Sequence, residues 1–315
     1  MTQPPLGTYF RTPVSAGRVI AFLTERHSCQ IESASAKDLL LEGICDSRDG
    51  GQKQLAFSSY DDFPGVQTLT ESLVVIENIP DKRIRGSNEF CMVADPRAAF
   101  MDALCWLIEA VGVDAHRRGF TEEAGISPEA QIAPTAVIEP GVEVGAGSII
   151  SAGVVLKTGT RVGENSVIRE NVVIGSDGVT VYRAEDGRLL KFPHVGGVYI
   201  GSNTEVGACA VIAGGILAST HIGNDVVVGN LCNIGHGAVV EDAVWMSVGS
   251  LLGGHTRVHA GATIAMGVTI RDNLVIGESA SLGMGSVVVK NVEAKHSMFG
   301  NPAKRMIGLK TGPKR

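Results

Sequence analysis

The 315-residue sequence is poor in aromatic and charged residues and contains no long apolar run. Aromatic residues make up 5% of the chain and charged residues 19%. No apolar stretch approaches the length needed to span a bilayer, and residues 1–18 lack the hydrophobic segment of a signal peptide. The formal net charge of −6 argues against nucleic acid as the main partner. These absences predict a cytoplasmic protein without a membrane span.

Cysteine is also scarce, and its spacing excludes the usual cysteine motifs. The six cysteines are scattered, and no two of them form a CxxC pair. This pattern indicates small, reduced hydrophobic side chains in a cytosolic protein.

Branched aliphatic residues, by contrast, recur at every sixth position through most of the chain after residue 131. The series is Ile132, Ile138, Val144, Ile150, Leu156, Val162, Ile168, Ile174, then Ile200, Val206, Ile212, then Ile222, Val228, Ile234, Val240, Met246, Leu252, Val258, Ile264, Ile270, Ile276, Leu282 and Val288. A period of six fits neither an α-helix nor an ordinary strand. It fits a solenoid whose coil is a triangle of three short strands, about 18 residues per coil, with one aliphatic side chain pointing inward per side. The chain is therefore predicted to be mainly β, a left-handed parallel β-helix of hexapeptide repeats.

Residues 1–125 lack the six-residue pattern and are predicted to form a small α/β domain. Its clearest helix runs from Pro96 to about Val111, because Asp95 can cap it, Pro96 fits its first turn and Gly112 ends it. Shorter elements are expected at Ala16–Glu25 (helix) and at Leu73–Glu77 and Phe90–Val93 (strands). The β-helix domain is expected over 126–295, followed by a short basic tail over 296–315.

Two places depart from the repeat and are the candidates for chemistry. Residues 179–199 form a polar excursion between two coils, which we interpret as a functional loop. The run Asn230-Leu-Cys-Asn-Ile-Gly-His236 puts an imidazole at an outward-facing position of a hexad. A solvated surface histidine is the alternative for such a lone residue.

These segments resemble the UDP-3-O-acylglucosamine N-acyltransferases of lipid A biosynthesis, within the hexapeptide-repeat acyltransferases. Residues 230–236 are similar to that family's N-x-x-Q-I-[AG]-H. Lys191-Phe-Pro-His194 followed by Gly196-Gly-Val-Tyr-Ile-Gly201 is similar to its K-I-P-Q-x-G-x-V-x-I-G. In the N-terminal part, Gly43-Ile-Cys-Asp46, Gln54-Leu-Ala-Phe57 and Met92-Val-Ala-Asp-Pro96 fall, in order, where the family has its own short motifs.

The resemblance implies an N-acyltransferase whose general base is His236, which takes a proton from an amine as the amine attacks a thioester. Gly254 lies one coil beyond His236 and would offer its N–H to the oxyanion. Asn230 and Asn233, in the same motif, would contact the sugar substrate. The family's sites lie in the cleft between neighbouring β-helices, so a homotrimer is implied.

The resemblance also implies a uridine-binding N-terminal domain, with clear departures. Phe57 matches an aromatic residue of the family that clamps uracil, and Phe63 can replace the second aromatic, but Asp62 stands where the family has lysine. Asn273 stands where the family has a second histidine near the acyl and sugar groups; it can donate a hydrogen bond but cannot be a cation. After Ile212 the family's D-R-G is replaced by Ala213-Gly-Gly215.

The sequence is compatible with either of two acyl donors, acyl carrier protein or CoA. The family often ends in a long helix that docks acyl carrier protein, and Lys310–Arg315 is too short and too Gly/Pro-broken to form it. Gly300-Asn-Pro-Ala-Lys-Arg305 resembles instead the end of the β-helix in sugar acetyltransferases that use acetyl-CoA. Lys304 and Arg305 would meet donor phosphates, either of CoA or of the phosphopantetheine of acyl carrier protein. No tightly bound cofactor is expected.

Three functions are therefore distinguished. The first is N-acylation of a UDP-linked amino sugar in lipid A assembly. The second is a CoA-dependent N-acetyl- or acyltransferase acting on another nucleotide-linked amino sugar of a surface polysaccharide. The third is a β-helix metalloenzyme of the γ-carbonic-anhydrase kind or a non-catalytic relative. We reject it because the spacing of the histidines does not fit a metal site. His255 is one residue out of stacking register with His236, and His255 and His259 are spaced H-x3-H rather than H-x4-H. No metal site is predicted.

Overall fold

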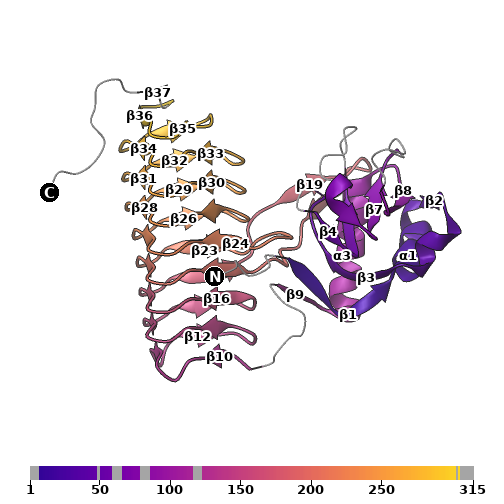
Figure 1. Ribbon diagram of the computed structural model, residues 1–315, viewed down its shortest axis with the longest axis horizontal. Helices are drawn as coiled ribbons and strands as arrows, with labels where there is room; N and C mark the ends of the chain where they lie inside the picture. Colours follow the sequence, from indigo (N-terminus) through magenta and orange to yellow (C-terminus); the bar gives the residue numbers. More distant parts are fainter. Residues whose placement is uncertain are drawn as a thin grey trace. The chain divides into compact units, whose positions relative to one another are not determined.

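The computed structural model describes residues 7–47, 50–58, 66–78, 86–115, 123–302 and 304–305. Their contacts separate two compact units (Figure 1). The β-helix unit comprises Thr121–Gly178, Gly197–Gly215 and Ser219–Arg315. The N-terminal unit comprises Met1–Phe120 together with two segments from later in the chain, Val179–Gly196 and Ile216–Ala218.

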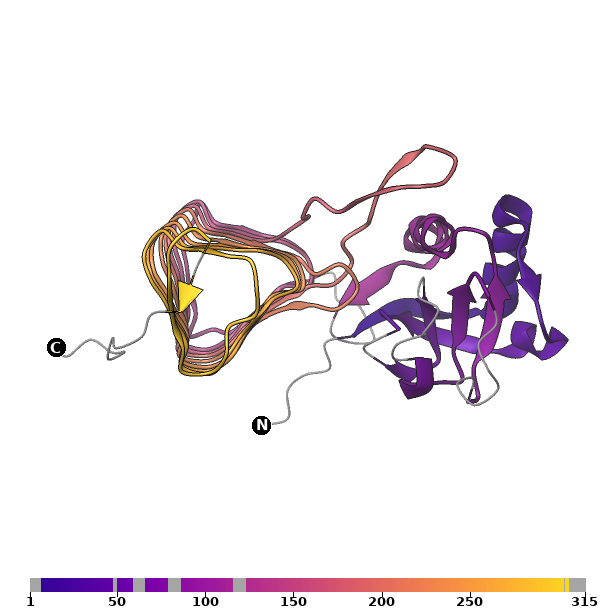
Figure 2. The ribbon, with the colours of Figure 1, turned by 90° about the horizontal axis from the view of Figure 1, so that it is seen from above.

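Three sheets, parallel except for the terminal strand β37, form the sides of the β-helix unit, which is triangular when seen along its axis (Figure 2). The first sheet holds β10 (Gly125–Ile126), β13 (Glu143–Val144), β16 (Thr160–Val162), β21 (Val198–Ile200), β24 (Thr220–Ile222), β27 (Val239–Val240), β30 (Arg257–Val258) and β33 (Val275–Ile276). The second holds β11 (Gln131–Ile132), β14 (Ile149–Ile150), β17 (Val167–Ile168), β22 (Glu205–Val206), β25 (Val227–Val228), β28 (Trp245–Met246), β31 (Thr263–Ile264), β34 (Ser281–Leu282), β36 (Ser297–Phe299) and β37 (Lys304–Arg305). The third holds β12 (Val137–Ile138), β15 (Val155–Leu156), β18 (Val173–Ser176), β23 (Val211–Ala213), β26 (Asn233–Ile234), β29 (Leu251–Leu252), β32 (Thr269–Ile270) and β35 (Val287–Val288).

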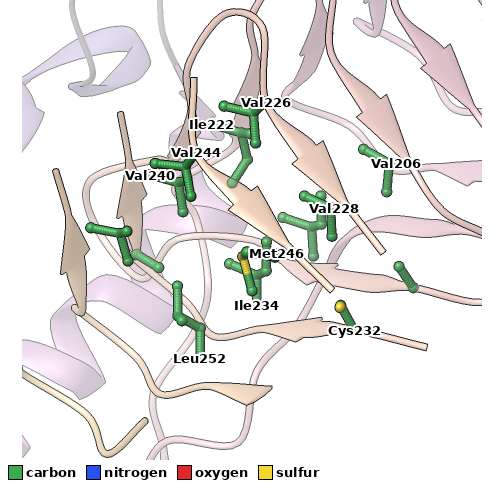
Figure 3. Close-up of a cluster of buried hydrophobic side chains, with 14 of the residues drawn as sticks. Val206, Ile222, Val226, Val228, Cys232, Ile234, Val240, Val244, Met246 and Leu252 are labelled. Carbon is green, nitrogen blue, oxygen red and sulfur yellow. The ribbon is translucent and has the colours of Figure 1, made fainter. Parts of the chain in front are cut away.

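The aliphatic residues of the repeat fill the interior of these coils. From Val144 to Val288 every one of them belongs to a single buried core (Figure 3). Ile132 and Ile138 are only partly buried, since they lie in the first coil and have a neighbouring coil on one side only. The predicted fold class, mainly β with a parallel β-helix and a small α/β region, is confirmed.

Buried hydroxyl groups satisfy backbone groups at the coil corners. Thr204 is representative: its Oγ1 donates to the carbonyl of Gly223 in the next coil at 2.9 Å and accepts from the N–H of Val226 at 3.1 Å. Ser166 makes the same kind of bridge, donating to the Gly201 carbonyl at 2.8 Å and accepting from the Thr204 N–H at 3.1 Å. Each bridge provides hydrogen-bond partners for one buried amide and one buried carbonyl, which would destabilise the fold if they were unpaired.

A mixed seven-stranded sheet forms the centre of the N-terminal unit. Its strand order is β2-β8-β7-β5-β3-β1-β9, with bounds β1 (Thr8–Ser15), β2 (Gln30–Ile31), β3 (Leu40–Ile44), β5 (Gln54–Phe57), β7 (Leu73–Ile76), β8 (Glu89–Met92) and β9 (Val113–Ala115). A separate pair joins β4 (Gly51–Gln52) to β6 (Leu69–Thr70). Among the described residues of this unit, the helical elements are α1 (Ala16–His27), α3 (Pro96–Val111) and the 3-10 turns η1 (Ala34–Asp38) and η2 (Val66–Thr68).

Helix α3 has the predicted boundaries because its caps have the chemistry that the sequence indicated. The Asp95 carboxylate accepts from the Ala98 N–H at 2.9 Å, and Gly112 follows the last residue with φ of 73°. Helix α1 runs two residues beyond the expected end at Glu25, and Ser28, in the left-handed conformation, terminates it. The expectation that all cysteines are reduced is wrong: Cys29 and Cys91 are joined by a disulfide. Their separation of 62 residues hides this pairing from any spacing rule.

The polar excursion is not an irregular loop but a β-hairpin of β19 (Val181–Arg183) and β20 (Leu189–Lys191). It clusters with the N-terminal unit rather than with the coils that precede and follow it. Tyr182 donates to the Asp95 carboxylate at 3.1 Å, and Phe192 is buried in the core of that unit. The excursion is therefore a structural part of the N-terminal unit.

Candidate active site

His236 lies in the turn that connects β26 of the third sheet to β27 of the first. Ile234 of β26 pairs with Leu252 of β29, so residues separated by 18 positions stack on one another here. His236 thus stacks on Gly254, which lies at the equivalent corner of the next coil. The strand register therefore agrees with the predicted stacking of these two residues.

Glycine at position 254 is required by the imidazole itself. A Cβ atom on Gly254 would lie 2.5 Å from Cε1 and 2.7 Å from Nε2 of His236. In the described part of the chain, no group accepts a hydrogen bond from the Gly254 N–H. An N–H that is free beside an imidazole can bind a developing oxyanion.

A second imidazole, His255, lies edge-on against His236. The ring centroids are 4.9 Å apart with an interplanar angle of 74°. The His255 N–H donates to the His236 carbonyl at 2.8 Å, which fixes the two turns to each other. The 18-residue coil already predicts that His255 lies beside His236, one residue out of stacking register with it.

Burial sets the protonation state of His236. The side chain is half-buried, and desolvation lowers its pKa below the ordinary histidine value, while the negative charge of Asp272 partly opposes this shift. A lowered pKa keeps the imidazole neutral at neutral pH. A neutral imidazole can accept a proton, as a general base must.

The three asparagines predicted to bind substrate occupy different places. Asn273 lies at the same corner as His236: its N–H donates to the Gly254 carbonyl at 2.9 Å, and its side chain donates to Asp272 at 2.8 Å. Asn230 lies at the preceding corner, where its side-chain oxygen accepts from the Ala208 N–H at 2.9 Å. Asn233 is exposed on the outer face of the third sheet, between Val211 and Leu251. Asn273 therefore shares a corner of the β-helix with His236, and Asn230 makes a contact that stabilises a turn.

The remaining predicted residues lie elsewhere. Phe57 ends β5 in the N-terminal unit and is half-buried, with its ring centroid 4.7 Å from that of Phe100 and 6.4 Å from that of Phe192. Phe63 lies outside the described residues. Lys304 and Arg305 are exposed and form β37, which pairs antiparallel with β36 at the end of the second sheet.

Neither a metal centre nor a membrane-spanning helix is found in the parts of the chain that the structure describes. Within those residues, no three histidine, cysteine or acidic side chains converge in a way that would hold an ion. Among the described helices, none has both the length and the apolar character needed to cross a bilayer.

Parts of the chain are similar to known sugar acyltransferases. No protein-family model matches the sequence. A UDP-3-O-acylglucosamine N-acyltransferase of Shewanella denitrificans is 38% identical over 84 residues, which cover 27% of this chain and 24% of that protein. The match thus spans about a quarter of the length of that relative. The structure of a UDP-N-acetylglucosamine acyltransferase of Francisella novicida matches with a TM-score of 0.53 and 25% identity, covering 59% of this chain and 66% of the other. The resemblance to the hexapeptide-repeat acyltransferases inferred from the sequence is confirmed.

Proposed function

We propose that this chain, as a relative of the hexapeptide-repeat acyltransferases, is an N-acyltransferase that transfers an acyl group from a thioester to the amine of a UDP-linked amino sugar. The observation that carries the proposal is the close packing of the half-buried His236 imidazole on Gly254, whose N–H has no acceptor among the described residues. The activities named for the Shewanella and Francisella proteins support this choice of reaction and substrate class.

In the proposed reaction the sugar amine attacks the thioester carbonyl carbon, and a C–N bond forms. His236 accepts the proton that the nitrogen loses, and the Gly254 N–H donates a hydrogen bond to the oxygen, which becomes negatively charged. Collapse of this intermediate breaks the C–S bond, and the thiolate receives the proton from His236. The products are an amide on the sugar and a free thiol.

Residues of each unit are assigned to parts of the substrate. Asn273, at the same corner as His236, is suited to hydrogen-bond a sugar or acyl oxygen. Phe57 is assigned to the nucleotide base, and Asn233, exposed on the third sheet, to the sugar. The His236 corner alone leaves the reacting groups open to water, so the proposal includes a homotrimer whose neighbouring subunit closes the cleft. A cytoplasmic location fits substrates of this kind.

Replacement of His236 by alanine tests the proposal. If His236 is the general base, turnover of a UDP-amino sugar with acyl-carrier-protein or acyl-CoA donors should fall on the order of 10²–10⁴-fold. His259→Ala is the matched control, because His259 lies at a different corner, where its Nδ1 contacts Glu241 at 2.9 Å. His255 is unsuitable as a control because its ring touches His236. A His236→Ala enzyme that keeps more than half of the wild-type rate contradicts the proposal.

A second function, CoA-dependent acylation of another nucleotide-linked amino sugar, is favoured by one observation. Lys304 and Arg305 are both exposed on β37, directly after the turn that resembles that of acetyl-CoA-dependent enzymes. Exposed cations of this kind suit the phosphates of a diffusible donor. Mass spectrometry of the product, after panels of amino sugars and of both donor types are offered, separates the two functions.

A further inference from the structure

Thr220 makes an unusual pair of hydrogen bonds beside the His236 turn. It begins β24, directly after the break in the repeat at residues 213–219, and its side chain is fully buried. Its Oγ1 donates to the Ala213 carbonyl at 2.7 Å and accepts from the Gly237 N–H at 2.9 Å. The second contact reaches the residue that immediately follows His236.

This bridge differs from the regular one made by Thr204. Thr204 donates to a carbonyl of the next coil. It accepts from the N–H of Val226, the residue of that coil that stacks on Thr204. Thr220 donates instead to a carbonyl seven residues earlier in its own loop. Strand pairing of His221 with Val239 places Ala238 at the level of Thr220, yet Thr220 accepts from Gly237. The break in the repeat thus redirects one hydroxyl to the His236 turn.

The consequence is that the peptide group joining His236 to Gly237 is held from both sides. Its N–H donates to Thr220 in the preceding coil, and its carbonyl accepts from the His255 N–H in the following coil at 2.8 Å. A peptide group is planar, so two fixed hydrogen bonds fix its orientation. The Cα atom of His236 lies in that plane, so the clamp also restrains the point from which the imidazole side chain extends.

We infer that Thr220 is a positioning residue for the catalytic base, which holds the His236 imidazole against Gly254 by clamping the peptide that follows it. The inference rests on the proposed function, because it gives Thr220 a role only through His236. The substrate has no contact with Thr220, since the hydroxyl is buried beneath the turn. Its loss should therefore change the rate of the chemical step and leave substrate binding in place.

Thr220→Val removes the hydroxyl and keeps the shape of the side chain. We expect kcat to fall about 10- to 100-fold, because small displacements of a reacting group are costly. KM for the sugar should stay within about twofold, and Thr220→Ser should restore kcat. If the valine variant does not fold, Thr220→Ala keeps the test open, since it places no methyl group against the Ala213 carbonyl.

Thr204→Val is the matched control, because it removes the same kind of bridge at a corner without His236. It should lower the thermal stability as Thr220→Val does but leave kcat unchanged. An equal fall in kcat in both variants, or an unchanged kcat in Thr220→Val, overturns the inference.

The double variant His236→Ala/Thr220→Val separates this inference from the proposed function. If Thr220 acts through His236, the double variant should be no slower than His236→Ala alone. An additional loss in the double variant contradicts the positioning role but leaves His236 as the base. A fully active His236→Ala enzyme instead removes the proposed function and the inference together.

Discussion

The two units of this protein place their candidate site residues by different means. In the β-helix unit, His236, Gly254 and Asn273 lie at one corner because strands repeat at a fixed spacing, which aligns residues far apart in sequence. In the N-terminal unit, Phe57 meets Phe100 of α3 and Phe192 of the excursion, and no period relates these three positions. Periodic structure turns sequence distance into spatial distance, and non-periodic structure does not.

Two corners of the β-helix differ in the hydrogen bonding of their backbone amides. At the corner between the first and second sheets, Glu241 accepts from the Ala260 N–H at 3.1 Å and contacts His259. At the His236 corner, the equivalent N–H belongs to Gly254 and has no acceptor among the described residues. The Glu241 carboxylate thus contacts both the imidazole and an amide of its corner, and these contacts stabilise the turn. In the proposed reaction, the Gly254 N–H at the His236 corner is the donor to the oxyanion.

Gly254→Ala should have the largest effect among the tests of this comparison. The added Cβ would lie 2.5 Å from Cε1 of His236, so the imidazole must move away from the amide. We expect kcat/KM to fall on the order of 10²-fold, because the base and the oxyanion donor lose their relative placement. Gly125→Ala is the control: there the new Cβ meets only Glu143 Cγ at 3.4 Å and the Val142 carbonyl at 3.9 Å. Steady-state kinetics of both variants measures the difference, and an active Gly254→Ala enzyme would show that the stacking has no catalytic role.

Phe57→Ala tests the N-terminal side of the comparison. If Phe57 stacks on the nucleotide base, UDP affinity measured by calorimetry should fall about tenfold, in line with about 1–3 kcal/mol for a stacked base. Because Phe57 also contacts Phe100 and Phe192, Phe57→Leu serves as a packing control that keeps an apolar side chain but removes the aromatic face. Unchanged UDP binding by a folded Phe57→Ala variant would remove the nucleotide-binding assignment of this unit.

The pH dependence should give the smallest effect. His236 acts only when it is neutral, so kcat/KM rises with pH through its pKa and is level above it. Burial lowers the pKa of His236, so the acid limb should lie below the ordinary histidine range. Asp272→Asn removes the charge that raises this pKa and should move the limb to still lower pH. Profiles between about pH 5 and 8 measure the shift, with Asp225→Asn, at another corner, as the control. A shift toward higher pH would contradict the assignment of the limb to His236.

The sequence predicts several residues of the candidate site but not the contacts that support them. The stacking of His236 on Gly254 followed from coil length alone. The hydrogen bonds of Thr220 cannot be predicted from the repeat, because they form where the six-residue period is interrupted. Asn230 was assigned to substrate from its motif, whereas its side chain accepts from a turn amide in the preceding coil.

The sequence by itself determined the β-helix, the identity of its inward residues, helix α3 with its caps and the position of the candidate base. These follow from period and local chemistry, which act over one coil or one turn. Tertiary structure decided the disulfide between Cys29 and Cys91, the hairpin within the excursion and the lowered pKa of His236. Each of these depends on which residues, remote or irregularly spaced in the chain, come to lie against one another, and packing alone fixes that.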